Sequence, residues 1–278
     1  QSVLQTSETR HLERAVNWLA STGILIRGKT DWNFIHQTFF DYCYARRFVE
    51  QGNNIFETLL ASKQGVFERP KLIQIISYLR TYDHPQYLRD LQNLLFSNVL
   101  GFHLYDLLLN WFGGLQNPKT DEWNLALKIL GDDQKFSRLL IAMYGNPEWF
   151  KYLTPFIPHW LEDEERQAVT LGYLRSIIDH SQHETIQILE RFLGKSDMWN
   201  EQIALSVFHI RNWQTDNAVS LFEKTIYQLK SPLRRDLLHL EKVCEISPIS
   251  GCRIIRYLFD QALNNQMASS SQFTSSFF

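Results

Sequence analysis

Apolar residues recur three and four positions apart along most of the chain, a spacing that predicts amphipathic α-helices with one buried face each. The first predicted helix follows Thr9, and its expected buried stripe consists of Leu12, Ala15, Val16 and Leu19. Gly23 is placed to end this helix, because glycine adopts the left-handed backbone conformation that is common at helix C-termini.

Between residues 24 and 35 the pattern becomes extended and aromatic, which predicts a β-hairpin. Residues 24–26 form one strand and residues 32–35 its partner, and we expect Gly28 in the turn between them to have a positive φ. A second helix is predicted over residues 37–51 and ends at Gly52. Its inward-facing residues are expected to be Phe39, Tyr42, Cys43 and Phe48.

From residue 53 onward the pattern is helical, with interruptions at Gly, Pro and Asn. Helices are predicted at residues 55–61, 70–82, 85–96, 99–112, 120–130, 134–144 and 147–152. Pro70, Pro85 and Pro147 fit the first helical turn, where a missing N–H costs little. Residues 154–159 contain two prolines, so we expect them to interrupt the helices and change the direction of the chain.

The second half has a regular period. Helical hairpins are predicted where residues 164–179 pair with 184–193, 197–210 with 215–229, and 232–244 with 250–264. These hairpins begin about 33 to 35 residues apart, which favours stacked helical repeats over an irregular bundle. Residues 267–278 are rich in serine, lack helical periodicity and are predicted to form a disordered tail.

The predicted fold class is therefore all-α. A partial winged helix with a short β-hairpin is followed by an α-solenoid of helical hairpins, similar to HEAT or TPR repeats. The predicted domains are the end of a winged-helix domain at 1–52, a helical linker at 53–155, HEAT-like repeats at 156–266 and the tail at 267–278. Because the chain begins at Gln1 rather than methionine, we expect further domains upstream.

Residues 23–30, Gly-Ile-Leu-Ile-Arg-Gly-Lys-Thr, match the pattern G-x-x-x-x-G-K-[ST] of a phosphate-binding loop. Such a loop follows a buried strand and opens a helix, whereas here a helical pattern precedes Gly23 and an extended segment follows Thr30. Residues 24–26 are also bulky and favour a strand over a loop whose amides converge on a phosphate. A hairpin is therefore the preferred interpretation.

Composition narrows the class of protein. The 278 residues are 44% hydrophobic with a formal net charge of -2, which argues against a dedicated nucleic-acid-binding protein. Cys43, Cys244 and Cys252 provide neither a disulfide framework nor paired metal spacing, so we expect a cytoplasmic location. The sequence contains no secretory signal and no apolar run near the ~20 residues that cross a bilayer, so no membrane partner is expected.

Three clusters of polar residues are candidate sites. His180, His183 and Glu184 could place two metal ligands on one helix face, but residues 179–182 are typical of a turn between helices and no third ligand is evident, so no metal site is expected. Residues 163–165 are acidic and fit a solvated helix start better than acid–base catalysis. The basic residues Lys230, Arg234, Arg235 and Lys242 are neutralised by Asp236, Glu241 and Glu245.

Tryptophans are spread through the helical part, and most are expected to be core residues or wedges between helices: Trp111, Trp123, Trp149, Trp160, Trp199 and Trp213. A tryptophan or tyrosine exposed on the repeats would instead mark a surface for binding a partner.

The stretch Phe34-Ile35-His36-Gln37-Thr38-Phe39-Phe40-Asp41-Tyr42-Cys43-Tyr44-Ala45-Arg46 joins the predicted hairpin to the next helix. It resembles the end of the winged-helix domain in NACHT-type STAND ATPases, whose signature there reads roughly Phe-x-His-x-Thr-Phe-Gln-Glu-Tyr-x-Ala-Ala-Arg. The matching residues are Phe34, His36, Thr38, Phe39, Tyr42, Ala45 and Arg46. Phe40, Asp41 and Tyr44 depart from the signature, which changes the contact of this helix with an upstream module.

The resemblance implies that His36 contacts the phosphate of bound ADP, once the upstream NACHT module supplies the nucleotide site. An imidazole N–H can donate to a phosphate oxygen without a fixed charge. In the isolated chain, His36 would instead cap the following helix or bond a local carbonyl. No cofactor is expected in this chain, whereas ATP or ADP and Mg²⁺ are expected in the full-length protein.

The expected function is a non-catalytic sensor or scaffold region of a STAND ATPase that recognises a protein or other macromolecule on its helical surface. The resemblance implies nucleotide-dependent homo-oligomerisation of the full-length protein, often in defence signalling. The alternative is a stand-alone α-solenoid adaptor that binds protein or nucleic acid. A helical hydrolase with a site near His180, His183 and Glu184 is a third, less favoured, hypothesis.

Overall fold

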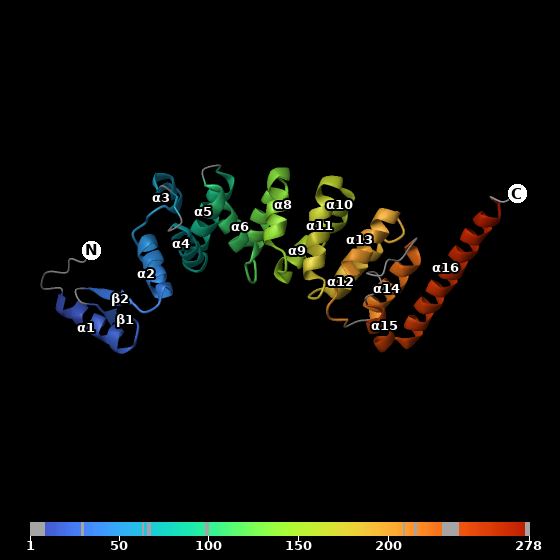
Figure 1. Ribbon diagram of the computed structural model, residues 1–278. Coiled ribbons are helices and arrows are strands. Elements are labelled where there is room, and N and C mark those ends of the chain that lie inside the picture. The colour runs from blue at the N-terminus through green and yellow to red at the C-terminus, as the bar shows by residue number, and fades with distance from the viewer. Residues whose placement is uncertain are drawn as a thin grey trace. The chain divides into compact units, whose positions relative to one another are not determined.

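The computed structural model consists of α-helices and one two-stranded hairpin within the residues it describes (Figure 1). These residues are 9–28, 31–62, 64–65, 68–97, 100–207, 209–213, 216–229 and 239–275, with the backbone alone for 9–11 and 264–275. The chain divides into two compact units, Gln1–Phe112 with Lys119–Leu125 as unit 1, and Gly113–Pro118 with Ala126–Phe278 as unit 2. The all-α fold class is confirmed, and the predicted borders at 52/53 and 155/156 stay predictions.

The predicted hairpin is confirmed at the start of unit 1. Strand β1 (Leu25–Arg27) pairs antiparallel with β2 (Trp32–Phe34), and Leu25 lies opposite Phe34. Gly23 ends the preceding helix α1 (Thr9–Ser21) with a φ of +74°, as expected. Gly28, however, does not have a positive φ. A Cβ at this position would overlap only the end of the exposed Asp31 side chain, which can move aside, and the Gly28 N–H donates to the Asp31 carbonyl at 2.8 Å.

Helix α1 does not bury the predicted stripe. Leu12 is 41% exposed, Ala15 is also exposed, and Val16 and Leu19 are half-buried. The helix packs on β1, and this small strand is too short to cover an apolar face of three turns.

Helix α2 (Gln37–Glu50) turns a different face inward from the one predicted. Its buried residues are Asp41, Ala45 and Phe48, which lie four and three positions apart and face α4 (Glu68–Tyr82). Of the predicted inward residues, Phe48 is buried, whereas Phe39, Tyr42 and Cys43 are exposed. Gly52 ends the helix with a φ of +70°, as expected.

Helices α3 to α7 complete the first part of the helical region. They are α3 (Ile55–Ala61), α4, α5 (His84–Phe96), α6 (Phe102–Gly113) and α7 (Thr120–Leu130), close to the predicted ranges. The start of α7 belongs to unit 1, where Arg80 of α4 forms two hydrogen bonds to the fully buried Glu122 carboxylate, at 2.6 and 3.0 Å. The Lys119 backbone N–H donates to the same carboxylate at 2.7 Å.

Unit 2 continues through α8 (Asp133–Ala142), a 3-10 turn η1 (Pro147–Trp149), α9 (Phe150–Leu153), α10 (Ile157–Glu162), α11 (Glu164–Ile177) and α12 (Gln182–Glu190). It ends with α13 (Asp197–Val207), α14 (Asp216–Gln228), α15 (Leu240–Ile246) and α16 (Pro248–Ser275). The helices pack in two rows, α8 with α11 and α13, and α12 with α14 and α16. This two-row packing confirms the helical repeats.

Two predicted breaks differ from the structure. Residues 157–159 of the predicted interruption belong to α10, because Pro158 occupies the first helical turn, where proline is tolerated. Helix α16 runs to Ser275, far beyond the predicted end at residue 264, so the backbone up to residue 275 of the predicted tail is helical. Residues 276–278 lie outside the described part of the chain.

The predicted role of the tryptophans is confirmed. Trp149, Trp160 and Trp199 are buried, and Trp111, Trp123 and Trp213 are half-buried. Trp149 also donates its indole N–H to the Gly113 carbonyl at 2.9 Å, and Asn146 donates to the same carbonyl at 2.8 Å. These bonds fix the first segment of unit 2 to η1.

The Arg80–Glu122 pair should govern the stability of unit 1 in acid. Burial alone raises the pKa of the Glu122 carboxyl, but the hydrogen bonds from Arg80 and Lys119 and the charge of Arg80 outweigh it and leave the pKa below its usual value. This contribution to stability is complete above the unfolded pKa of about 4.3 and is lost as the pH falls through the lower folded pKa.

We expect Glu122→Gln to lower the free energy of unfolding at neutral pH by about 3 kcal/mol, because it leaves a partly buried guanidinium without its counter-charge. Urea denaturation at pH 7 and in acid measures this loss, which should shrink in acid. The matched control is Glu50→Gln in the exposed pair with Arg46 (2.7 Å), with an expected loss of at most about 0.5 kcal/mol. Equal losses in the two variants would contradict the prediction.

Candidate functional site

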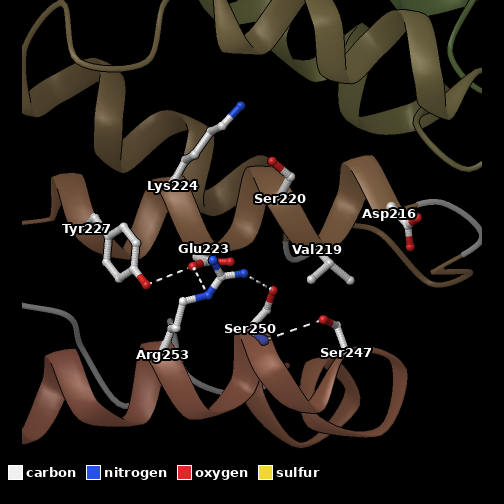
Figure 2. Close-up of a pocket in the computed structure, with 9 residues that line it drawn as sticks. All are labelled: Asp216, Val219, Ser220, Glu223, Lys224, Tyr227, Ser247, Ser250 and Arg253. Atoms are coloured by element: carbon white, nitrogen blue, oxygen red, sulfur yellow. Dashed lines mark hydrogen bonds and ion pairs between the residues drawn. The ribbon is translucent and has the colours of Figure 1, made fainter.

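The candidate site is a groove of about 350 Å³ in unit 2, between α14 and the segment from Ser247 into α16 (Figure 2). Helix α14 contributes six lining residues: Asp216, Val219, Ser220, Glu223, Lys224 and Tyr227. The opposite wall consists of Ser247, Ser250 and Arg253.

Glu223 is the centre of a polar network across this groove. Its Oε1 atom lies 3.2 Å from Arg253 Nε and accepts a hydrogen bond from the Tyr227 hydroxyl at 2.8 Å (Figure 2). Arg253 also donates to Ser250 Oγ at 3.2 Å. The Glu223 side chain is only 13% exposed, whereas that of Arg253 is 60% exposed. A nearly buried carboxylate thus holds an accessible guanidinium in place.

Among the residues that line the groove, Tyr227 has the pKa most changed by its surroundings. Burial, the hydrogen bond to Glu223 and the negative charge of Glu223 together raise the pKa of Tyr227 to about 12. The phenol is therefore protonated at neutral pH and acts as a hydrogen-bond donor. It has no role as a base under these conditions.

Two further hollows share Tyr227 and extend the groove along the second row of helices. One, of about 440 Å³, lies between α12 and α14, where Lys224 pairs with Glu190 at 2.8 Å. The other, of about 410 Å³, is lined by Tyr257 and by Arg253, Arg256 and Asp260 of α16. The Tyr227 and Tyr257 rings meet edge to face at 4.8 Å, and the Tyr257 hydroxyl donates to the Tyr227 carbonyl.

The lining side chains of the groove are of kinds that proteins use to bind partners. Its basic and acidic side chains nearly balance, and two of the bases, Lys224 and Arg253, are held by carboxylates. The described lining residues include no histidine or cysteine that could serve as base or nucleophile beside Ser220, Ser247 or Ser250. Tyrosine and arginine, which do line the groove, are enriched where proteins bind partners.

The Glu223–Arg253 pair in the groove is one of a series of ion pairs between neighbouring repeats. The sequence patterns considered above did not predict this series. Each pair joins an acid to a base 30 to 34 residues later on a neighbouring repeat: Asp133 with Arg166, Glu162 with Lys195 (3.4 Å), Glu190 with Lys224 (2.8 Å) and Glu223 with Arg253 (3.2 Å). The signal that could have found them is this recurrence of opposite charges at the repeat period.

The site residue predicted from the sequence, His36, lies in unit 1. His36 is the N-cap residue of α2, but its side chain makes no capping hydrogen bond, so the expected capping role is wrong. The imidazole is exposed and contacts the Phe39 ring with centroids 6.2 Å apart. His36, Phe39, Phe40 and Cys43 share the outer face of α2, which we call the His36 face.

Of the other residues of the family pattern, Phe34 lies on β2 and the rest are divided between the two faces of α2. Ala45 is buried, and Phe34 is half-buried and packs edge-on against Phe40 at 6.0 Å. Thr38, Phe39, Tyr42 and Arg46 are exposed, and Arg46 pairs with Glu50. Asp41, at the position of the family glutamate, is buried and accepts a hydrogen bond from Gln37 at 2.8 Å.

The candidate metal residues do not come together. His180 lies in the predicted turn before α12, while both ring nitrogens of His183 contact side-chain amides, of Gln187 at 2.9 Å and of Asn217 at 2.6 Å. Among the described side chains, no group of three or more His, Cys, Asp and Glu residues could hold a metal ion. No described helix has the length and apolarity needed to cross a membrane.

The remaining polar clusters behave as follows. Asp163 caps α11 by accepting from the Glu165 N–H at 3.0 Å, as expected for a helix start. Lys242 pairs with Glu245 at 2.9 Å, in agreement with the predicted neutralisation. Lys230, Arg234, Arg235 and Asp236 lie outside the described residues.

The hairpin at 25–34 leads to a first prediction for ligand binding. A chain that continues from β1 into β2 does not open a helix after the turn, so it lacks the geometry that cradles a triphosphate. We expect isothermal titration of this chain with Mg-ATP to give no binding heat. A micromolar affinity that Lys29→Ala removes would contradict this expectation.

Tyr227 leads to a second prediction. Because its folded pKa of about 12 exceeds the usual value near 10, its contribution to stability is complete below pH ~10 and is lost as the pH rises toward 12. In Tyr227→Phe, the free energy of unfolding should therefore fall less steeply between pH ~10 and ~12, as measured by urea denaturation. Glu223→Gln should reduce part of the same fall in the free energy of unfolding with pH. If both variants lose stability with pH as steeply as the unmodified protein, the raised pKa of Tyr227 is refuted.

No protein-family model matches the chain, and no curated protein or solved structure is significantly similar to it. The residues and geometry described above are therefore the basis for assigning a function.

Proposed function

We propose that this chain is a non-catalytic sensor or scaffold region of a STAND ATPase of the NACHT type. In this proposal the helical repeats bind a macromolecular partner, and the hairpin and α2 dock on an upstream nucleotide-binding module. The observation that carries it is the His36 face, an exposed aromatic surface at the junction where the sequence resembles the family.

The exposure of this surface supports docking. Phe39 and Phe40 are 42% and 44% exposed, and Trp32 of β2 and Ile35 just after it are 38% and 40% exposed. Aromatic side chains bury large areas and contribute strongly to interfaces when they are covered. A module seated on the His36 face would remove these rings from water and place the free imidazole at its surface.

The histidine itself supports a contact with nucleotide. Since its side chain makes no capping bond to α2, an imidazole N–H is free to donate to a phosphate oxygen of the docked module. ATP or ADP and Mg²⁺ would be held by that module. His36 would then report the state of the nucleotide to the hairpin and α2.

The groove around Tyr227 supports recognition by the repeats. It runs past α12, α14 and α16 and presents Tyr227, Tyr257 and Arg253, with most charges already paired. A polar protein segment fits this chemistry better than a phosphate backbone, which requires a surplus of basic side chains. A partner would activate the switch only by binding its open state more tightly than its closed state. The open state would then assemble as a homo-oligomer.

The second candidate function is a stand-alone helical-repeat adaptor. The observation that favours it is that the groove lies wholly in unit 2 and is complete without any residue of the His36 face. This adaptor would bind a protein partner in the same groove, with no nucleotide involved.

The proposal is tested on the intact gene product that contains this sequence. We expect that protein to retain bound nucleotide after purification and to release it several-fold faster in the His36→Ala variant, because one phosphate contact is lost. Release of a fluorescent ADP analogue measures the rate. The matched control is His159→Ala, which removes an exposed histidine from α10 of unit 2.

The outcomes separate the two functions. Faster release in His36→Ala with no change in His159→Ala supports the switch. An intact gene product without a nucleotide-binding module, or equal release rates in all three proteins, would overturn the switch and leave the adaptor.

A further inference from the structure

Helix α16 carries apolar residues on two faces. Its inner face, with Ser250, Gly251 and Ile254 buried, packs on α14 and α15. Its outer face carries a stripe of apolar residues, four to six positions apart, that is left in solvent: Ile249 is 72%, Ile255 38%, Phe259 67% and Leu263 52% exposed. A helix that is apolar on both sides is typical of a buried element.

Helix α16 is also long. At 28 residues it extends over about 42 Å, well beyond the 6 to 15 residues of most other described helices of the chain. Its outer stripe, described between residues 249 and 263, offers a surface for another helix.

Two charged residues identify the partner. Arg256 and Asp260 lie on one flank of the stripe, both exposed, four positions apart and opposite in charge. Within the described residues, neither forms an ion pair. A base and an acid at this spacing are complementary to the same two residues on an antiparallel copy of the helix, because a two-fold axis level with residue 258 brings position 256 opposite position 260.

We propose that α16 pairs antiparallel with α16 of a second copy of this chain. In this register, Arg256 faces the partner's Asp260, and Asp260 faces the partner's Arg256. Both contacts fall on the same flank of the helix pair, as the two-fold axis requires. Phe259 lies next to the axis, so the two Phe259 rings fill the centre of the interface.

This pairing goes beyond the proposed function, since it needs neither nucleotide nor an upstream module. Arg256 and Asp260 also line the end of the groove beside Tyr227. The second copy would therefore form part of the wall at that end, and each dimer would hold two grooves related by the two-fold axis.

The experiment measures the mass of this chain in solution by sedimentation equilibrium over about a hundredfold range of concentration. We expect a dimer of the 32.9 kDa chain that dissociates on dilution. Phe259→Asp should raise the dissociation constant at least about tenfold, because it places two carboxylates at the axis. Ile141→Asp is the matched control, since Ile141 is 53% exposed on α8, outside the stripe.

A charge exchange distinguishes a second copy from any other occupant. Arg256→Asp and Asp260→Arg should each weaken the dimer, because each places like charges opposite one another twice. The double variant R256D/D260R restores both pairs and should restore the dimer. Far-UV circular dichroism confirms that each variant is folded. A monomer at every concentration, a dimer that survives Phe259→Asp, or a double variant as weak as the singles would overturn the proposal.

Discussion

A single helical hairpin cannot bury both of its apolar faces, and this constraint organises most of the molecule. In unit 2 each helix of a row is covered by the next one in the row, from α8 through α11 to α13 and from α12 through α14 to α16. The ion pairs follow the same geometry, because each joins neighbouring repeats. Where the coverage stops, as on α2 and on α16, apolar side chains remain in solvent, and these are the surfaces for which we propose partners.

The local parts of this fold could be predicted from the sequence. Helices α3 and α7 begin and end at the predicted residues, and the hairpin follows from β-favouring residues on both sides of a short turn. Which face of α2 is buried could not be predicted, because the helix carries aromatic residues on several sides. Only its packing on α4 selects Asp41, Ala45 and Phe48 as the buried residues. The end of α16 was missed because serine weakens the apolar pattern without breaking a helix.

The groove could not be predicted from local sequence patterns, for a related reason. Glu223, Tyr227 and Arg253 are brought together by the stacking of α16 on α14, and nothing in the sequence near any one of them marks it as part of a site. His36 is the reverse case, since a short motif singles it out and the structure leaves its imidazole exposed. The two sites thus differ in origin: one arises from tertiary packing, the other from local sequence.

The short reach of the cross-helix bonds in unit 2 has an evolutionary consequence. Among the described residues of unit 2, the side-chain hydrogen bonds that cross more than six residues span 25 to 36 residues, so each one joins only adjacent helical repeats. Duplication or deletion of one helical repeat would disturb only the hydrogen bonds on either side of that repeat and leave the others intact. Descendants of this gene can therefore gain or lose whole repeats of about 33 residues. Their recognition surface would become longer or shorter while the remaining repeats keep their contacts.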